Sequence, residues 1–145
     1  DDTPEAKRAA KKCRVQEGRA HAALVYRGAD CVGWCQFGSP AELPRIHNQR
    51  AYDKENMTLP DWRITCFFSG KGHRGGGVAS AALTGAIAQI TALGGGRVEA
   101  YPEDIEGRKA SPAFLFNGAL HMFDRMGFDR TRKIGKHKWV VTLTV

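Results

Sequence analysis

One stretch of the sequence decides the fold, and it reads Gly72-His73-Arg74-Gly75-Gly76-Gly77-Val78-Ala79-Ser80. It follows the apolar run of residues 64–68 and opens an alanine-rich segment, so the pattern predicts a strand, a glycine turn and the start of a helix. The first backbone N–H groups of a helix have no partner within the helix, and the helix dipole adds positive charge at the same end. We therefore expect a phosphate-bearing cofactor at this turn.

Size and composition favour a single domain over residues 1–145. Of the 145 residues, 42% are hydrophobic and 26% are charged, which is ordinary for a globular protein with one core. The most apolar stretch, residues 78–93, is interrupted by polar side chains and is shorter than the ~20 residues of a membrane-spanning helix. We therefore expect no membrane as a partner.

The chain is basic, with a formal net charge of +7. A surface of this sign attracts polyanions, so a basic nucleic-acid-binding module is one alternative function. The densest basic run, residues 130–138, is followed by one aromatic residue, Trp139, and lacks the interleaved aromatic side chains on which bases stack. Nucleic acid is therefore not the favoured partner.

The four cysteines and five histidines do not indicate a metal site. The sequence has no Cys-x-x-Cys pair, and no histidine stands at a recognisable ligand spacing from a cysteine. The charged segment of residues 1–12 is unlike a signal peptide. We therefore expect no metal, reduced thiols and a cytoplasmic protein.

The rest of the sequence predicts alternating helices and strands. The expected elements are a helix at 5–17, strands at 22–27, 31–37 and 62–68, a helix at 77–93, a strand at 97–101, a helix at 114–126, and strands at 128–133 and 139–145. Residues 38–61 form a long connection in which residues 42–52 have room for a helical turn or two. We expect a mixed α/β (α+β) fold: a twisted, mostly antiparallel sheet with a central β-α-β crossover and a C-terminal β-hairpin.

Three local patterns in this order of elements resemble the GNAT superfamily of N-acetyltransferases. The cofactor signature of that family is Arg or Gln, two residues, Gly, one residue, then Gly or Ala, and it is matched by Arg74, Gly77 and Ala79. The sequence Met122-Phe123-Asp124-Arg125-Met126-Gly127-Phe128 is similar to the end of the family's late helix, and Val32-Gly33-Trp34 to one of its strands. The resemblance covers about residues 5–145, and it implies the fold, an acetyl-CoA cosubstrate and an amine acceptor.

The resemblance also implies where acetyl-CoA, or a related acyl-CoA, binds. Its pyrophosphate is expected at the backbone of the glycine turn, and its pantetheine arm is expected along the main chain at the end of the central strand. Asn117 stands near a position where the family often has a cofactor-contacting asparagine, although a helix cap explains it equally well. The expected cofactor-binding residues are Phe67, Phe68, Ser69, Arg74, Gly75, Gly76, Gly77, Val78, Ala79, Ser80 and Asn117.

The implied reaction is direct attack of a neutral amine on the thioester within a ternary complex. Many relatives protonate the leaving thiolate with a tyrosine, but this chain has Phe123 there, and a phenyl ring has no proton to give. Tyr101 and His121 are the candidate substitutes, and Glu99 is the candidate base. A strand carboxylate that faces solvent or pairs with Arg97 is the alternative role for Glu99. A protein that binds CoA as a sensor or scaffold, without transfer, is the alternative function.

The family fold usually begins with a further strand and one or two helices before the segment that residues 1–18 represent. We therefore expect the first strand and helix of that fold to be missing from the chain, and with them part of the acceptor site. The acceptor itself stays open, from small amines to protein N-termini. The terminal hairpin offers a sheet edge through which a homodimer can form.

Overall fold

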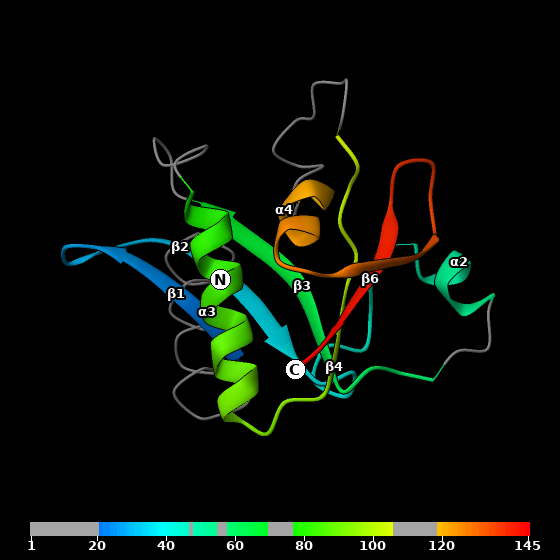
Figure 1. Cartoon of the computed structure of the whole chain (residues 1–145), viewed down its shortest axis with the longest axis horizontal. Coiled ribbons are helices and arrows are strands. Elements are labelled where there is room, and N and C mark those ends of the chain that lie inside the picture. The colour runs from blue at the N-terminus through cyan, green and yellow to red at the C-terminus, as the bar shows by residue number, and fades with distance from the viewer. Residues whose placement is uncertain (1–20, 47, 55–57, 70–76, 106–118) are drawn as a thin grey trace, which may run out of the picture.

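The computed structural model describes residues 21–46, 48–54, 58–69, 77–105 and 119–145. Its centre is a six-stranded sheet with the strand order β1-β2-β3-β4-β6-β5 (Figure 1). The strands are β1 (His21–Arg27), β2 (Asp30–Gly38), β3 (Trp62–Ser69), β4 (Arg97–Ala100), β5 (Asp129–Lys133) and β6 (Trp139–Thr144). Only β3 and β4 pair in parallel, and the other neighbours are antiparallel. The predicted mixed, mostly antiparallel sheet is therefore confirmed.

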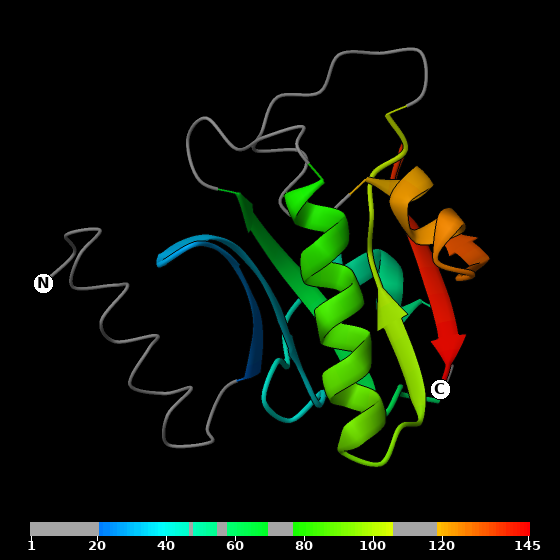
Figure 2. The same ribbon diagram turned by 60° about the vertical axis from the view of Figure 1, so that its left-hand side comes forward.

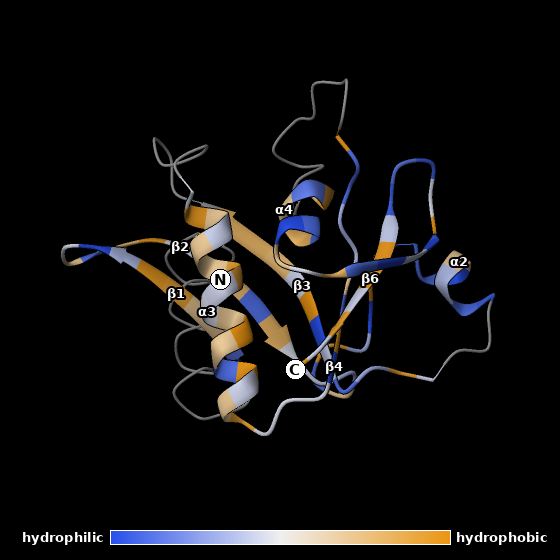
Figure 3. Ribbon diagram, viewed as in Figure 1, coloured by the Kyte–Doolittle hydropathy of each residue, from blue (hydrophilic) through white to orange (hydrophobic). Residues whose placement is uncertain are grey.

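Two helices pack on one face of this sheet, which we call the α3 face. Helix α3 (Val78–Ala92) lies across β1, β2 and β3 (Figure 2). Its helical spacing brings five apolar side chains to the buried side: Val78, Ala82, Leu83, Ala86 and Ile90. Helix α4 (Leu120–Arg125) adds Leu120, Met122 and Phe123 to the same core. Figure 3 shows the apolar residues gathered on α3 and on β1, β2 and β3, which it covers.

The opposite face is covered in part by the connection between β2 and β3, residues 39–61, which carries α2 (Gln49–Asp53). Neighbouring antiparallel strands need only a two-residue turn. This connection instead runs to the C-terminal hairpin, where Asn48 donates to the Ile134 carbonyl (3.0 Å) and Arg132 donates to the Tyr52 carbonyl (2.8 Å). A second apolar cluster forms there, made of Tyr52, Tyr101, Ile134 and Val140. We call residues 39–61 the α2 connection.

Most of the predicted elements are confirmed by the described residues, and one boundary is wrong. The helix predicted at 114–126 begins at Leu120, because Ala119 is extended (φ −92°, ψ 136°) and bridges Glu103. The Leu120 N–H donates to the Glu103 carbonyl at 2.7 Å, so pairing between distant segments overrides the helical pattern there. Residues 114–118 and the helix predicted at 5–17 lie outside the described residues.

None of the helices in the described ranges combines the length and the apolar character that crossing a membrane requires.

Candidate functional site

The two parallel strands of the crossover separate partway along β3. Their register covers three residue pairs and ends at Ile64 opposite Ala100. At the same level the pairing of β3 with β2 is irregular, since Gln36 pairs with Cys66 and Phe37 with Ile64, which leaves Thr65 as an extra residue in β3. Such a bulge bends the strand, and Figure 2 shows β3 and β4 diverging in a V with α3 across it.

Beyond this point β3 and the segment that follows β4 have different neighbours. β3 continues to Ser69 in register with β2. The chain after β4 follows β6 instead: the Trp139 N–H donates to the Pro102 carbonyl (3.0 Å), and the Asp104 N–H donates to the His137 carbonyl (2.7 Å). The backbone of residues 67–69 therefore forms the end of β3, and its edge toward β4 is not paired with β4.

Helix α3 begins beside this strand end, at Gly77. Gly77 has φ 79° and ψ 7°, a left-handed conformation that glycine adopts at little cost. Among the described residues no side chain caps this end of α3, and its first turn contains no acidic residue. The first N–H with a partner inside the helix is that of Ala81, which donates to the Gly77 carbonyl (3.0 Å). The N–H groups of Val78, Ala79 and Ser80 precede it, in the geometry that binds anions at helix N-termini.

Gly33 of β2 fixes the helix start against the strand end. A Cβ atom on Gly33 would lie 2.6 Å from the Phe68 carbonyl oxygen and would overlap the Val78 side chain. The absence of a side chain therefore lets α3 begin directly over β2 and β3. The Val-Gly-Trp pattern was the sequence signal for this position, but it did not reveal which two elements meet there.

The predicted cofactor-binding residues fall into two groups: those that the structure describes and those that lie outside the described residues. Phe67 is buried edge-to-face against Phe123 (5.9 Å between ring centroids), whereas Phe68 is 38% exposed and stacks on Trp34 at 4.3 Å. Together with Ser69 and residues 77–80, they lie at the junction of β3 and α3. Four others lie outside the described residues: Arg74, Gly75, Gly76 and Asn117.

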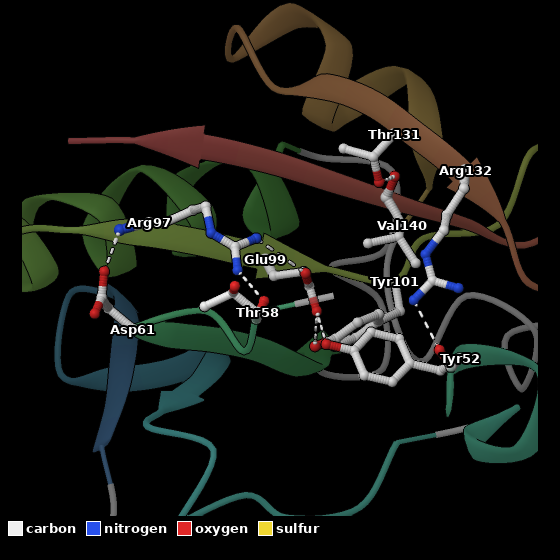
Figure 4. Close-up of polar contacts among 9 residues, drawn as sticks. All are labelled: Tyr52, Thr58, Asp61, Arg97, Glu99, Tyr101, Thr131, Arg132 and Val140. Carbon is white, nitrogen blue, oxygen red and sulfur yellow. Dashed lines mark hydrogen bonds and ion pairs between the residues drawn. The ribbon is translucent and has the colours of Figure 1, made fainter. Parts of the chain in front are cut away.

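The candidate base Glu99 lies on the face opposite α3, inside a polar cluster (Figure 4). Its side chain points away from the core positions Val98 and Ala100, and the residue is 3% exposed. Oε1 accepts hydrogen bonds from the hydroxyls of Tyr52 (2.6 Å) and Tyr101 (2.8 Å), and Oε2 pairs with Arg97 (3.3 Å). The carboxylate thus has three donors, and the predicted pairing with Arg97 is one of them.

A buried cation lies beside this cluster. Arg63 of β3 is the register partner of Glu99 and is 2% exposed. Its Nη1 donates to the Leu43 carbonyl (2.8 Å), and its guanidinium carbon lies 5.5 Å from the centre of the Tyr52 ring. Since Leu43 and Tyr52 both belong to the α2 connection, that connection closes over a charged part of the sheet.

The candidate acids lie in different places. Tyr101 is 1% exposed, and burial raises its pKa well above the ordinary tyrosine value, as does the neighbouring Glu99 carboxylate. Tyr101 therefore holds its proton more tightly than an exposed tyrosine does. His121 is exposed on α4, which packs on the α3 face. The structure thus brings Glu99 and Tyr101 together and leaves His121 outside their cluster.

Tyr52 gives this cluster a measurable pH dependence. Burial raises the pKa of Tyr52, and the hydrogen bond to Glu99 raises it further. Above the ordinary tyrosine pKa of about 10, the unfolded chain loses the proton while the folded chain keeps it, so stability falls as the pH rises. We expect urea titrations between pH 8 and pH 11 to show a smaller loss of stability in Tyr52→Phe than in the wild type.

The difference between the two proteins should approach about 1.4 kcal/mol per pH unit above pH 10. Burial lowers the pKa of Lys138, which acts in the opposite direction, but this contribution is present in both proteins and cancels in the comparison. Identical pH slopes in the two proteins would contradict the assignment of Tyr52 to a buried, un-ionised site.

The basic run of residues 130–138 is used within the fold. Arg130 pairs with Asp124 (2.8 Å), and Arg132 lies 4.9 Å from the centre of the Tyr52 ring as well as bonding its carbonyl. Lys138 is 7% exposed and donates to the Tyr101 carbonyl (3.2 Å), with Glu103 3.6 Å away. Arg130, Arg132 and Lys138 hold the hairpin to its neighbours, whereas Lys133 and Lys136 are exposed. Within the described residues, no three His, Cys, Asp or Glu side chains gather as a metal site would require.

Neither a protein-family model nor a curated protein matches this sequence. Solved structures do match it. An acetyltransferase described as a GNAT family member, from Desulfovibrio desulfuricans, has a TM-score of 0.59 at 16% identity over 98% of this chain and 82% of its own. An N-acetyltransferase from Staphylococcus aureus has a TM-score of 0.57 at 14% identity, over 100% of this chain and 78% of its own. A ribosomal-protein-alanine N-acetyltransferase from Brucella melitensis has a TM-score of 0.55 at 15% identity, over 97% of this chain and 76% of its own.

At such identities a structural likeness defines the fold and not the reaction. The chain has the fold of the GNAT N-acetyltransferases. In this chain the parallel β3–α3–β4 unit and the glycine start of α3 are features on which the sequence resemblance rested.

Proposed function

We propose that this protein is an N-acetyltransferase that moves an acetyl group from acetyl-CoA to an amine. The observation that carries the proposal is the start of α3 at Gly77, without a side-chain cap among the described residues, beside the diverging ends of β3 and β4 in a chain with the GNAT fold. Acetyl-CoA has phosphates for the helix start and an extended amide-bearing arm for a strand end. The two features therefore complement the two halves of one molecule.

In this proposal the pyrophosphate accepts hydrogen bonds from the N–H groups of Val78, Ala79 and Ser80, together with those of Arg74, Gly75 and Gly76, for which the sequence predicts a turn. The pantetheine arm lies along the backbone of residues 67–69 as an added strand, which uses main-chain groups and leaves the side chains free to pack. Phe67 meets this requirement, since its ring is buried against Phe123.

The reaction forms a bond between the amine nitrogen and the acetyl carbon and breaks the bond from that carbon to sulfur. The amine loses a proton, and CoA leaves as a thiolate that takes one up. We assign the first proton to Glu99. Its carboxylate is buried and already has three donors, so the proton reaches it through the hydroxyl of Tyr101 or Tyr52. His121, exposed on α4, is the proposed donor to the thiolate.

A CoA-binding protein without transfer is the second candidate, and Phe123 is the observation behind it. Phe123 is fully buried and packs edge-to-face on Phe67 and Phe128, so it serves the core and supplies no proton. Calorimetry with acetyl-CoA and a thiol-release assay with a panel of amines separate the two functions. Binding with turnover supports the transferase, whereas tight binding without thiol release from any amine supports the second candidate. No binding at millimolar acetyl-CoA contradicts both.

A further inference from the structure

Arg63 is a buried cation that the proposed reaction does not use. It is 2% exposed, and its Nη1 donates to a neutral group, the Leu43 carbonyl (2.8 Å). Its Nε is buried and makes no hydrogen bond within the described part of the chain, and no carboxylate there forms an ion pair with it. Burying a guanidinium without an anion is costly. The position is therefore suited to an anionic ligand.

The nitrogen without a partner is the one that a carboxylate would use. Nε and the Nη beside it form an edge of the guanidinium that binds both oxygens of a carboxylate through two parallel hydrogen bonds. The hydrogen bond from Arg63 to Leu43 uses Nη1 and leaves Nε unbonded. A carboxylate would thus supply both the missing acceptor and the missing charge.

Arg63 also lies beside the two hydroxyls through which the proposed base acts. Burial alone would lower the pKa of Arg63, but the neighbouring Tyr101 and Tyr52 oxygens raise it above the usual arginine value. The guanidinium carbon is 5.5 Å from the centre of the Tyr52 ring, whose hydroxyl donates to Glu99 at 2.6 Å. An amine nitrogen at these hydroxyls and a carboxylate at Arg63 can therefore belong to one small molecule.

The α2 connection covers this group of residues. Arg63, Glu99 and Tyr101 are each no more than 3% exposed, and the connection contacts them through Leu43 and Tyr52. Backbone pairing holds β3 and β4 in the sheet, whereas the connection is held there by hydrogen bonds to and from side chains. Entry of an acceptor therefore requires the connection to move away from the sheet.

We propose that the acceptor is an amine with a carboxylate close to its nitrogen, as in an amino acid, and that Arg63 binds this carboxylate beneath the α2 connection. The proposal rests on the proposed transferase function and names its substrate class. The carboxylate neutralises Arg63, and its position directs the amine nitrogen to the hydroxyls of Tyr52 and Tyr101.

Amino acids and their carboxamides test the substrate class as matched pairs: glycine with glycinamide, and L-leucine with L-leucinamide. The amide keeps the shape of the amino acid and removes its negative charge. We expect kcat/KM with acetyl-CoA to favour each amino acid over its amide by about tenfold or more, which is the order of one charge-assisted hydrogen bond. Equal use of the two members of each pair, or preference for the amides, would overturn the proposal while leaving the transferase intact.

Arg63→Met should abolish this preference and keep acetyl-CoA affinity within about threefold, because Arg63 lies outside the proposed cofactor site. Arg130→Met is the matched control. It removes the same charge from the other face of the sheet, where Arg130 lies over Trp139, and it should keep the preference. The same preference in both variants would show that Arg63 does not bind the acceptor.

A disulfide between the α2 connection and the C-terminal hairpin tests entry without altering Arg63. A Cβ on Gly135 would lie 3.7 Å from Cγ of Asn48, so Asn48→Cys and Gly135→Cys place two thiols within reach of each other. The oxidised double variant should bind acetyl-CoA as the reduced one does, but lose turnover of glycine by about tenfold or more until dithiothreitol is added. The two single variants control for the cysteines that the chain already has.

Full turnover by the oxidised double variant would overturn entry beneath the α2 connection. A wild type that does not bind acetyl-CoA would instead overturn the proposed function, and this inference with it.

Discussion

Gly77→Glu is expected to weaken acetyl-CoA binding by about 100-fold or more while the protein stays folded. The new carboxylate would stand at the start of α3, where the phosphates of the cofactor are proposed to lie, and would repel them at short range. It would also oppose the left-handed φ of 79°, a strain of about 1–2 kcal/mol. A Cβ on Gly77 meets no atom within 4 Å, so the side chain itself fits. Calorimetry measures the affinity, and circular dichroism checks the fold.

Gly94→Glu is the matched control, because it makes the same change at the other end of the same helix. Gly94 also has a positive φ, 116°, and open space around its Cβ position. The added charge is therefore the same and the backbone strain is at least as large, but the charge lies a helix length from the proposed phosphate site. The control should bind acetyl-CoA within about threefold of the wild type. An equal loss of affinity in both variants would show that Gly77 acts only through helix stability.

Glu99→Ala is expected to cost about 3–5 kcal/mol of unfolding free energy, because it leaves buried partners unpaired. The hydroxyls of Tyr52 and Tyr101 would lose their acceptor, and Arg97 would lose its ion pair. Urea denaturation measures the loss. A change below about 1 kcal/mol would contradict the buried, three-donor site described for Glu99.

Glu99→Gln separates the structural role of this residue from its proposed chemical role. An amide oxygen still accepts from the two tyrosines, so the fold should persist, but an amide does not take up a proton. We expect acetyl-CoA affinity to stay within about threefold and kcat to fall by about 100-fold, within the usual range for loss of a general base. Unchanged kcat and an unchanged pH profile would leave Glu99 as a structural residue only.

The parts of the fold that local pattern determines could be predicted from the sequence. The β1–β2 hairpin, the central strand and α3 each have the periodicity and the glycine boundaries that the structure shows. The start of α4 could not, because Ala119 is drawn into extended pairing with Glu103, which lies far away in the sequence. Local pattern contains no information about such a pairing.

In the candidate site, too, some residues could be predicted from the local sequence and others could not. The glycine start of α3 has a local signature, whereas the partners of Glu99 do not. Tyr52 lies in an irregular connection, and nothing in its neighbours predicts that its hydroxyl reaches a strand beyond β3. Arg63 reads as a polar residue at the start of an apolar strand, yet it is buried under the same connection. Both positions depend on the path of the α2 connection across the sheet.

Backbone amide shifts recorded while acetyl-CoA is added test the central claim most directly, because they locate the cofactor on the chain. The proposal predicts that the largest shifts in the 15N spectrum fall on Val78, Ala79 and Ser80 and on residues 67–69, and that the amides of the C-terminal hairpin change little. Saturable shifts confined to residues 130–138, or no shifts at millimolar acetyl-CoA, would contradict a cofactor site at the start of α3.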